Sequence, residues 1–272
     1  MTLSAASEFM ASAPRSTNAS DAWAEGYGQE LKGIVTRYAG QQPRSVQKHL
    51  GPSELGHECD RQVVAKMAGS KVTNHVADPW ASIMGTAGHA YVADAFDWDN
   101  AHNGYLRWLT EARVTPDPGY DPHPGTADLY DCFSRCVVDH KFQGESTRGK
   151  LKRDGPPRHY YVQLLLYRRG YLNLGLPVER VVIVSWPRTR STLDDMYVWS
   201  HVPTAADDQL VDDVLTQTAF RQQLADAVRA GTFNLMDVPA VPEDNECYFC
   251  LLYRPQAAYD GKYGCPGTLL AK

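Results

Sequence analysis

The sequence predicts an α/β fold, in which strands and helices follow one another along the chain. Residues 125–142 contain two apolar-rich runs around a polar turn, which is typical of a β-hairpin. Residues 178–186 are rich in β-branched side chains, which favours a buried strand. The apolar spacing in residues 159–174 and 204–231 predicts two long helices. We therefore expect a single α/β domain over residues 21–272.

The remaining segments complete this pattern. Helices are also predicted for residues 22–38 and 80–98, and strands for residues 106–115 and 196–201. Ser53 is expected to cap a further helix, in which Leu55, Cys59 and Val63 recur at four-residue steps. Residues 1–20 are rich in Ser, Ala and Thr and have little periodicity, so we expect a loose tail there.

Composition narrows the classes of protein that the chain can belong to. Of its 272 residues 43% are hydrophobic and 22% are charged, which is ordinary for a globular protein. The formal net charge is -5, so a nucleic-acid site would have to be a local basic patch. Five basic residues in 143–158 are candidates for that patch; they are Arg148, Lys150, Lys152, Arg153 and Arg158. The alternative is a solvated flexible loop.

Targeting signals are absent from the pattern of the sequence. No run approaches the roughly 18 apolar residues that a membrane helix needs. The N-terminus lacks a basic start followed by an apolar core, so we expect no secretory signal and a cytoplasmic location. In that compartment the six cysteines are expected to be thiols or metal ligands rather than disulfides.

The predicted hairpin brings charged side chains together. Strand side chains alternate between faces, so Asp139 and Lys141 point the same way, and Asp128 on the first strand can lie close to them. Neighbouring carboxylates repel unless a positive charge lies between them, and Mg²⁺ or Mn²⁺ prefers oxygen ligands of this kind. The hairpin therefore predicts a divalent-metal site in which Lys141 positions a water or stabilises charge on a phosphate. A surface hairpin with a cross-strand ion pair is the alternative.

These motifs resemble a known family. The pattern Gly-x-x-Asp at Gly125 and Asp128, followed by a turn and Asp-x-Lys, resembles the core of the PD-(D/E)xK nuclease superfamily. More narrowly it is similar to the RecB-like branch, which includes CRISPR-associated RecB-like exonucleases and AddB-type nuclease domains. Two further motifs of that branch are matched, namely Gly-x-x-x-His by Gly85 and His89 and Gln-x-x-x-Tyr by Gln163 and Tyr167.

The resemblance implies roles for these residues. One or two divalent ions would be held by His89, Asp128, Asp139 and the backbone carbonyl of His140. The catalytic residues would be Asp128, Asp139, Lys141, Gln163 and Tyr167. Glu111, on the strand predicted for 106–115, is a further candidate that the family often places near the site. Without the resemblance, His89 would be read as a core histidine, Gln163 and Tyr167 as packing with one hydrogen bond, and Glu111 as an exposed edge residue.

Four cysteines resemble the iron–sulfur ligands of the same branch. Cys247 and Cys250 form a Cys-x-x-Cys pair, which can grip one metal or cluster. Cys265 precedes a proline and lies further along the chain than the family usually sets its last ligand. Cys59 would be the distant first ligand, in an element where Ser53 and Arg61 also match. The resemblance implies a [4Fe–4S] cluster, and structural zinc is the competing metal. For Cys59 alone, a buried thiol on a core helix is the alternative. Cys132 and Cys136 are expected to be plain thiols.

The architecture that the resemblance implies is a restriction-endonuclease-like core, with a central mixed sheet flanked by helices. A cluster-stapled helical subdomain would be formed by residues 50–70 and 240–272. The function would be metal-dependent cleavage of DNA, exonucleolytic on single strands or ends. DNA would be the substrate, and a helicase or another recombination or CRISPR protein the partner. The alternatives are a DNA-end-binding or assembly protein with vestigial catalysis and a zinc-stapled structural domain.

Overall fold

The chain divides into two units, residues 1–46 and residues 47–272. The computed structural model describes residues 22–41, 50–74, 79–117, 123–189, 192–241, 247–248, 250–254 and 264–267. In the first unit, helix α2 (Ala22–Gly40) confirms the helix predicted there, and Trp23 and Tyr27 stack on one side of it. The tail expected at 1–20 lies outside the described residues.

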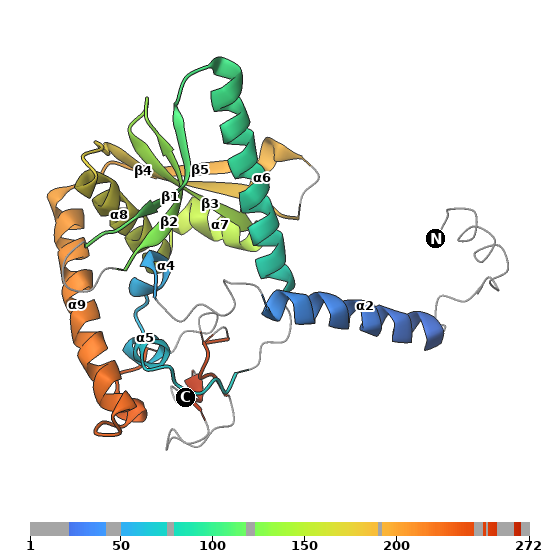
Figure 1. Cartoon of the computed structure of the whole chain (residues 1–272), viewed down its shortest axis with the longest axis vertical. Helices are drawn as coiled ribbons and strands as arrows, with labels where there is room; N and C mark the ends of the chain where they lie inside the picture. The colour runs from blue at the N-terminus through green and yellow to red at the C-terminus, as the bar shows by residue number, and fades with distance from the viewer. Residues whose placement is uncertain are drawn as a thin grey trace. The chain divides into compact units, whose positions relative to one another are not determined.

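The second unit is built on a five-stranded sheet with the strand order β1-β2-β3-β4-β5 (Figure 1). The strands are β1 (Trp108–Val114), β2 (Gly125–Asp131), β3 (Cys136–Gln143), β4 (Arg180–Pro187) and β5 (Tyr197–His201). Neighbouring strands are antiparallel, except for β3 and β4, which are parallel. The predicted mixed sheet and its β2–β3 hairpin are confirmed.

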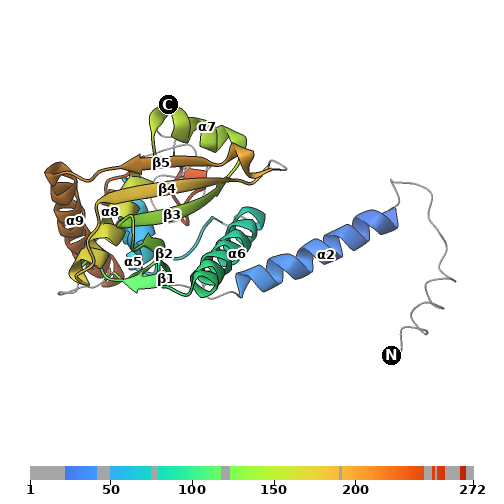
Figure 2. The same cartoon turned by 90° about the horizontal axis from the view of Figure 1, so that it is seen from above.

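Helices cover both faces of this sheet, and Figures 1 and 2 show α6 and α9 on opposite sides of it. The helices are α4 (Pro52–Leu55), α5 (Asp60–Met67), α6 (Trp80–Asn103), α7 (Glu145–Asp154), α8 (Arg158–Asn173) and α9 (Ala205–Arg229), with 3-10 turns η1 (Leu193–Asp195) and η2 (Leu235–Asp237). Helix α8 packs Leu164 and Tyr171 against Val181 and Ile183 on one face of the sheet, and Phe96 of α6 packs on the other. In the described part of the chain, no helix combines the length and apolar character that crossing a membrane would take.

Parallel strands need a crossover, and the one between β3 and β4 carries α7 and α8. The structure corrects the single basic patch expected in this segment. Residues 145–154 form a helix, so consecutive side chains point to different sides. Arg148 is buried, the Lys152 ammonium lies over the Tyr197 ring, and Arg153 pairs with Asp154.

The segment with Cys59 differs from the predicted helix. Gly51 is the N-cap of α4, so Ser53 lies inside that short helix, and Cys59 is the N-cap of the separate helix α5. Gly56 breaks the expected single helix because it lies against α8, where a Cβ would come within 2.7 Å of Val162.

One buried arginine joins this segment to α9. The guanidinium of Arg221, only 1% exposed, donates to Asp60 at 2.7 Å, to the carbonyl of Leu55 at 3.0 Å and to that of His57 at 2.8 Å. It therefore provides hydrogen bonds for two backbone carbonyls between the end of α4 and the start of α5, which have no partner within a helix.

The C-terminal residues pack beside α5. Ala65 lies in one buried cluster with Cys250 and Leu252, and the N–H groups of Thr73 and Asn74 donate to the Leu251 carbonyl. The two segments that the sequence expects to form a subdomain therefore lie together.

Candidate active site

The site forms where strands β2 and β3 separate. Their paired ladder ends at Leu129 and Val138, one step before Asp128 and Asp139. Beyond that step the N–H of His140 donates to Asp128 Oδ2 at 2.6 Å in place of a backbone carbonyl. The side chain of Asp128 thus replaces a ladder bond, which fixes its carboxylate at the opening between the strands.

Helix α6 brings His89 to this opening. A Cβ on Gly88 would come within 2.5 Å of the Phe142 ring, so the absence of a side chain there lets α6 approach β3 closely. His89 Nδ1 then lies 3.4 Å from Asp128 Oδ1. Gly85, which the family motif singles out, has open space around it, so Gly88 is the glycine that this packing requires.

A chain of polar contacts leads from Asp139 to helix α8. Lys141 Nζ lies 2.8 Å from Asp139 Oδ2 and donates to Gln163 Oε1 at 3.1 Å. The amide of Gln163 donates in turn to the Tyr167 hydroxyl at 3.1 Å, one helical turn further along α8. The Tyr160 ring lies under the ammonium, 4.5 Å from Nζ to the ring centroid. Asp139, Gln163 and Tyr160 thus hold Lys141 in one place, and Tyr167 holds Gln163.

Burial and charge make the two carboxylates different. Burial raises the pKa of Asp139 to about 6, although the charge of Lys141 opposes this shift. Burial would also raise the pKa of Asp128, but the hydrogen bond and charge of His89, with Lys141 and the His140 N–H, leave it below its usual value. Asp139 is therefore the carboxylate in greater need of a further positive partner.

The two basic groups of the site, His89 and Lys141, hold their protons more firmly than usual. Burial lowers the pKa of His89, but the hydrogen bond and charge of Asp128 outweigh burial and raise it. Burial acts in the same direction on Lys141, and the charges of Asp139 and Asp128 raise its pKa above the usual value. The two carboxylates therefore favour the protonated forms of His89 and Lys141, and the protonated forms in turn favour the charged carboxylates.

Glu111, which the sequence offers as a further candidate outside the expected set of ligands, also lies at the site. It lies on β1 between the paired positions Thr110–Leu129 and Ala112–Ala127, opposite Asp128. Its φ of 46° is unusual for a residue other than glycine, and such strain is concentrated at functional sites. Ligand atoms of His89, Glu111 and Asp128 all lie within 4.8 Å of one another. Only the register of β1 against β2, which the sequence does not specify, reveals this placement.

The donor set suits a hard divalent cation. The group of His89, Glu111 and Asp128 is a possible metal site with two carboxylates and one imidazole. Asp139 Oδ1 is buried and has no hydrogen-bond partner among the described residues, which leaves one carboxylate oxygen available. The side chain of His140 is buried beside Phe96 and Trp186, so a role for this residue would fall to its backbone, as expected.

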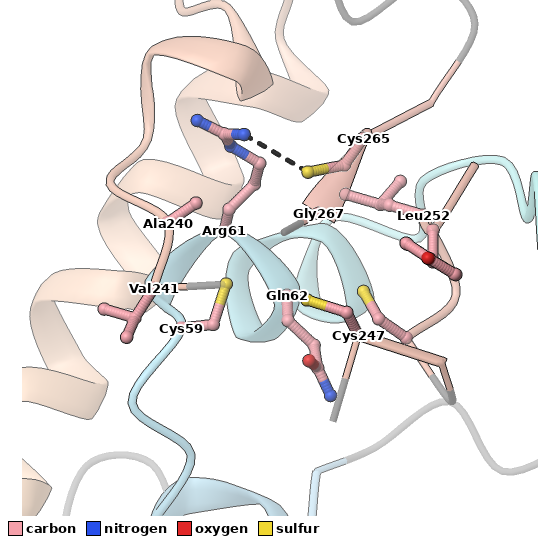
Figure 3. Close-up of a pocket in the computed structure, with 11 residues that line it drawn as sticks. Cys59, Arg61, Gln62, Ala240, Val241, Cys247, Leu252, Cys265 and Gly267 are labelled. Carbon is pink, nitrogen blue, oxygen red and sulfur yellow. Dashed lines mark hydrogen bonds between the residues drawn. The ribbon is translucent and has the colours of Figure 1, made fainter. Parts of the chain in front are cut away.

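A second group of candidate ligands lies between α5 and the C-terminal residues. The side chains of Cys59, Cys247, Cys250 and Cys265 line one pocket (Figure 3). The Arg61 guanidinium donates to Cys265 Sγ at 3.3 Å and to the carbonyls of Val238 and Met236. Burial raises the pKa of Cys250 to about 12, and the other three cysteines add to this shift. A thiolate at Cys250 would therefore need a positive partner. The thiols of Cys132 and Cys136 lie on the hairpin, away from this pocket.

Comparisons with known proteins leave the family open. No family model and no curated protein matches the sequence. Solved structures that resemble the chain include an alkaline exonuclease from Laribacter hongkongensis, at 13% identity over 68% of this chain and 91% of that chain, with a TM-score of 0.46. The same exonuclease in complex with dAMP has 12% identity over 68% and 93%, with a TM-score of 0.47. A phage-related exonuclease from Haemophilus somnus 129PT has 12% identity over 68% and 96%, with a TM-score of 0.45. Similarity at this level carries no argument about activity, which has to rest on the site itself.

Proposed function

We propose that this protein is a divalent-metal-dependent deoxyribonuclease that hydrolyses phosphodiester bonds in single strands or at DNA ends. The observation that carries the proposal is the pairing of the buried Asp139 with Lys141, across the opening from Asp128. Ordinary stabilising contacts do not account for a 1% exposed carboxylate with an unpartnered oxygen, because such a group costs free energy. Metal binding would offset that cost.

The ion would be held by His89, Glu111, Asp128, Asp139 and the backbone carbonyl of His140. When bound, it would lower the pKa of a water and neutralise charge on the phosphate. Lys141 would donate a hydrogen bond to a phosphate oxygen or to the attacking water, since its Nζ has three protons and a fixed position. Gln163 and Tyr167 would keep Lys141 in that position. A helicase or other recombination protein as partner stays a prediction from the resemblance.

The role of Glu111 gives a direct test of this function. The wild-type protein should cut labelled single-stranded DNA with Mn²⁺ and should not cut in EDTA. In Glu111→Gln, one anionic ligand becomes neutral, so the Mn²⁺ concentration for half-maximal rate should rise about 10- to 100-fold, the range known for weakened metal shells. The measurement is the initial cleavage rate over a Mn²⁺ series.

Glu179→Gln is the matched control for this experiment, because Glu179 is an exposed glutamate that pairs with Arg135 at the surface. It should keep the wild-type Mn²⁺ dependence. Identical Mn²⁺ curves for Glu111→Gln and the control would remove Glu111 from the site. A wild-type protein that cuts no DNA with any divalent metal would overturn the function.

We also propose a [4Fe–4S] cluster at Cys59, Cys247, Cys250 and Cys265. Four cysteines around one pocket match the ligand count of such clusters, and the Arg61 guanidinium next to Cys265 would stabilise a thiolate. Bound there, the cluster would tie α5 to the C-terminal residues and stabilise only the folded chain.

Protein purified without oxygen should contain iron and acid-labile sulfide in equal amounts. Cys265→Ala should lose most of the iron, whereas Cys132→Ser should keep it, because Cys132 lies on the hairpin outside the pocket. Stoichiometric zinc without iron would replace the cluster by a structural zinc ion, and no bound metal would refute both assignments.

A further inference from the structure

A groove of ≈ 940 Å³ runs beside the candidate active site. Its walls are residues 56–59, the length of α7, residues 155–157 and the start of α8, with Gln62 and Val241. Tyr160 lines the groove, and its ring also lies under Lys141 Nζ. Gln143, two residues after Lys141 on β3, lines it as well. A chain that occupied the groove would therefore contact the Tyr160 ring, on which the ammonium proposed to contact the scissile phosphate lies.

Two histidine rings in the wall of the groove stack on each other. The rings of His57 and His159 stack with centroids 5.1 Å apart and an interplanar angle of 4°, and Tyr160 meets His159 edge-on at 4.4 Å. Both histidines line the groove, although they come from segments about a hundred residues apart in the chain. Burial, with the charges of His57 and Lys141, lowers the pKa of His159 to about 4, so the ring is uncharged at neutral pH.

The charges around the groove are nearly balanced. Lys150 and Arg158 contribute positive charge, and Glu58 and Asp154 contribute negative charge, with Arg158 3.6 Å from Glu58. Attraction of phosphates alone would therefore be weak here. Aromatic rings add base stacking, which is the part of single-strand binding that does not depend on net charge.

We propose that the groove holds the unpaired DNA strand beside the cut, with one base stacked on the His57–His159 pair. This inference rests on the proposed nuclease function and adds the element that selects unpaired DNA. In a duplex the faces of each base are covered by its neighbours, so only an unpaired strand can place a base on these rings. The alternative occupant of the rings is the base of a free mononucleotide, and the experiment distinguishes it from a base of the strand.

The test measures binding without cleavage, by fluorescence anisotropy of a labelled single strand with no divalent metal added. His159→Ala should bind the strand about tenfold more weakly, which is the order of effect expected for one lost base–aromatic stack. His159→Phe keeps a flat ring and should bind within about twofold of wild type. Affinity for a blunt duplex of the same sequence should be unchanged in both. The matched control is His102→Ala, because His102 also stacks on an aromatic ring, Trp98, but lies outside the groove.

Two further measurements keep the result open to refutation. A strand with one abasic position next to the cut should weaken wild-type binding and should not further weaken His159→Ala. Ser146→Trp, at an exposed position in the groove wall, should obstruct the groove and also weaken strand binding about tenfold without changing either histidine. Competition by a free mononucleotide at micromolar concentration would assign the rings to product rather than to the strand.

The inference fails if His159→Ala binds the strand like wild type, if His159→Phe binds as weakly as His159→Ala, or if Ser146→Trp has no effect. These failures are distinct from failure of the nuclease proposal. A protein that binds through His159 and never cuts would refute the nuclease function alone, whereas one that cuts normally without the ring would refute the groove alone.

Discussion

Asp139→Asn is expected to remain folded and to cleave DNA at least about a thousandfold more slowly than the wild-type protein. The substitution conserves shape and removes a charge that is 1% exposed. It takes one anionic oxygen from the metal site and removes the partner that fixes Lys141 Nζ. Because the buried Lys141 ammonium loses its carboxylate partner, the metal-free variant should melt below the wild type. The measurements are the cleavage rate in saturating Mn²⁺ and the melting temperature without metal.

Asp131→Asn is the matched control, since Asp131 is another buried aspartate of the same hairpin, 4% exposed. It accepts two hydrogen bonds from Arg107 and two from the N–H groups of the turn at Phe133 and Ser134, and these contacts lower its pKa to about 2. The control should lose stability and keep its cleavage rate per folded molecule. Normal cutting by Asp139→Asn would refute the site assignment.

Arg221→Met is expected to lower the free energy of unfolding by about 3–5 kcal/mol. The methionine can fill the space of the arginine stem, but the carbonyls of Leu55 and His57 lose their hydrogen bonds. Asp60 loses its charged partner and keeps one hydrogen bond, from Gln217. Since these groups belong to the segment that carries Cys59, the iron content expected for the proposed cluster should fall together with stability. The measurement is urea unfolding followed by circular dichroism.

Arg229→Met, two turns along the same helix, is the comparison. Arg229 is exposed, where it pairs with Asp226 and donates to the Met67 carbonyl, so its loss should cost less than about 1 kcal/mol. Equal unfolding curves for the two variants would show that Arg221 does not hold the segment in place.

The parts of the site that are local in sequence could be predicted, because strand and helix periodicity decides them. Asp139 and Lys141 share a face because they lie two apart on a strand, and Gln163 contacts Tyr167 because they lie four apart on a helix. The parts that depend on long-range packing could not be predicted. Glu111 joins the site only through the register of β1 on β2. His57 stacks on His159 only when the segment between α4 and α5 packs on α8.

The basic patch predicted from the charge count of residues 143–158 was wrong for a related reason. A sum of basic residues does not say which side of a helix each one faces, and here Arg148 points inward while Arg153 pairs with its neighbour. The cap predicted at Ser53 was wrong because the helix begins at Pro52, with Gly51 as its N-cap and the Gly51 N–H donating to Glu54. The single helix predicted there is divided in two at Gly56, which contacts α8. Local propensity cannot anticipate a contact between parts of the chain that are far apart.

The crossover between β3 and β4 separates the part of the protein that shapes the groove from the strands that position the catalytic carboxylates. Parallel neighbouring strands cannot be joined by a tight turn, so a long connection is needed between β3 and β4. This connection forms most of the groove wall, through α7 and the start of α8. Insertions or exchanges in α7 would alter what the groove admits while the strand register that positions Asp128 and Asp139 stays the same. The crossover is therefore the segment at which a designer, or evolution, could retune substrate choice independently of the chemical step.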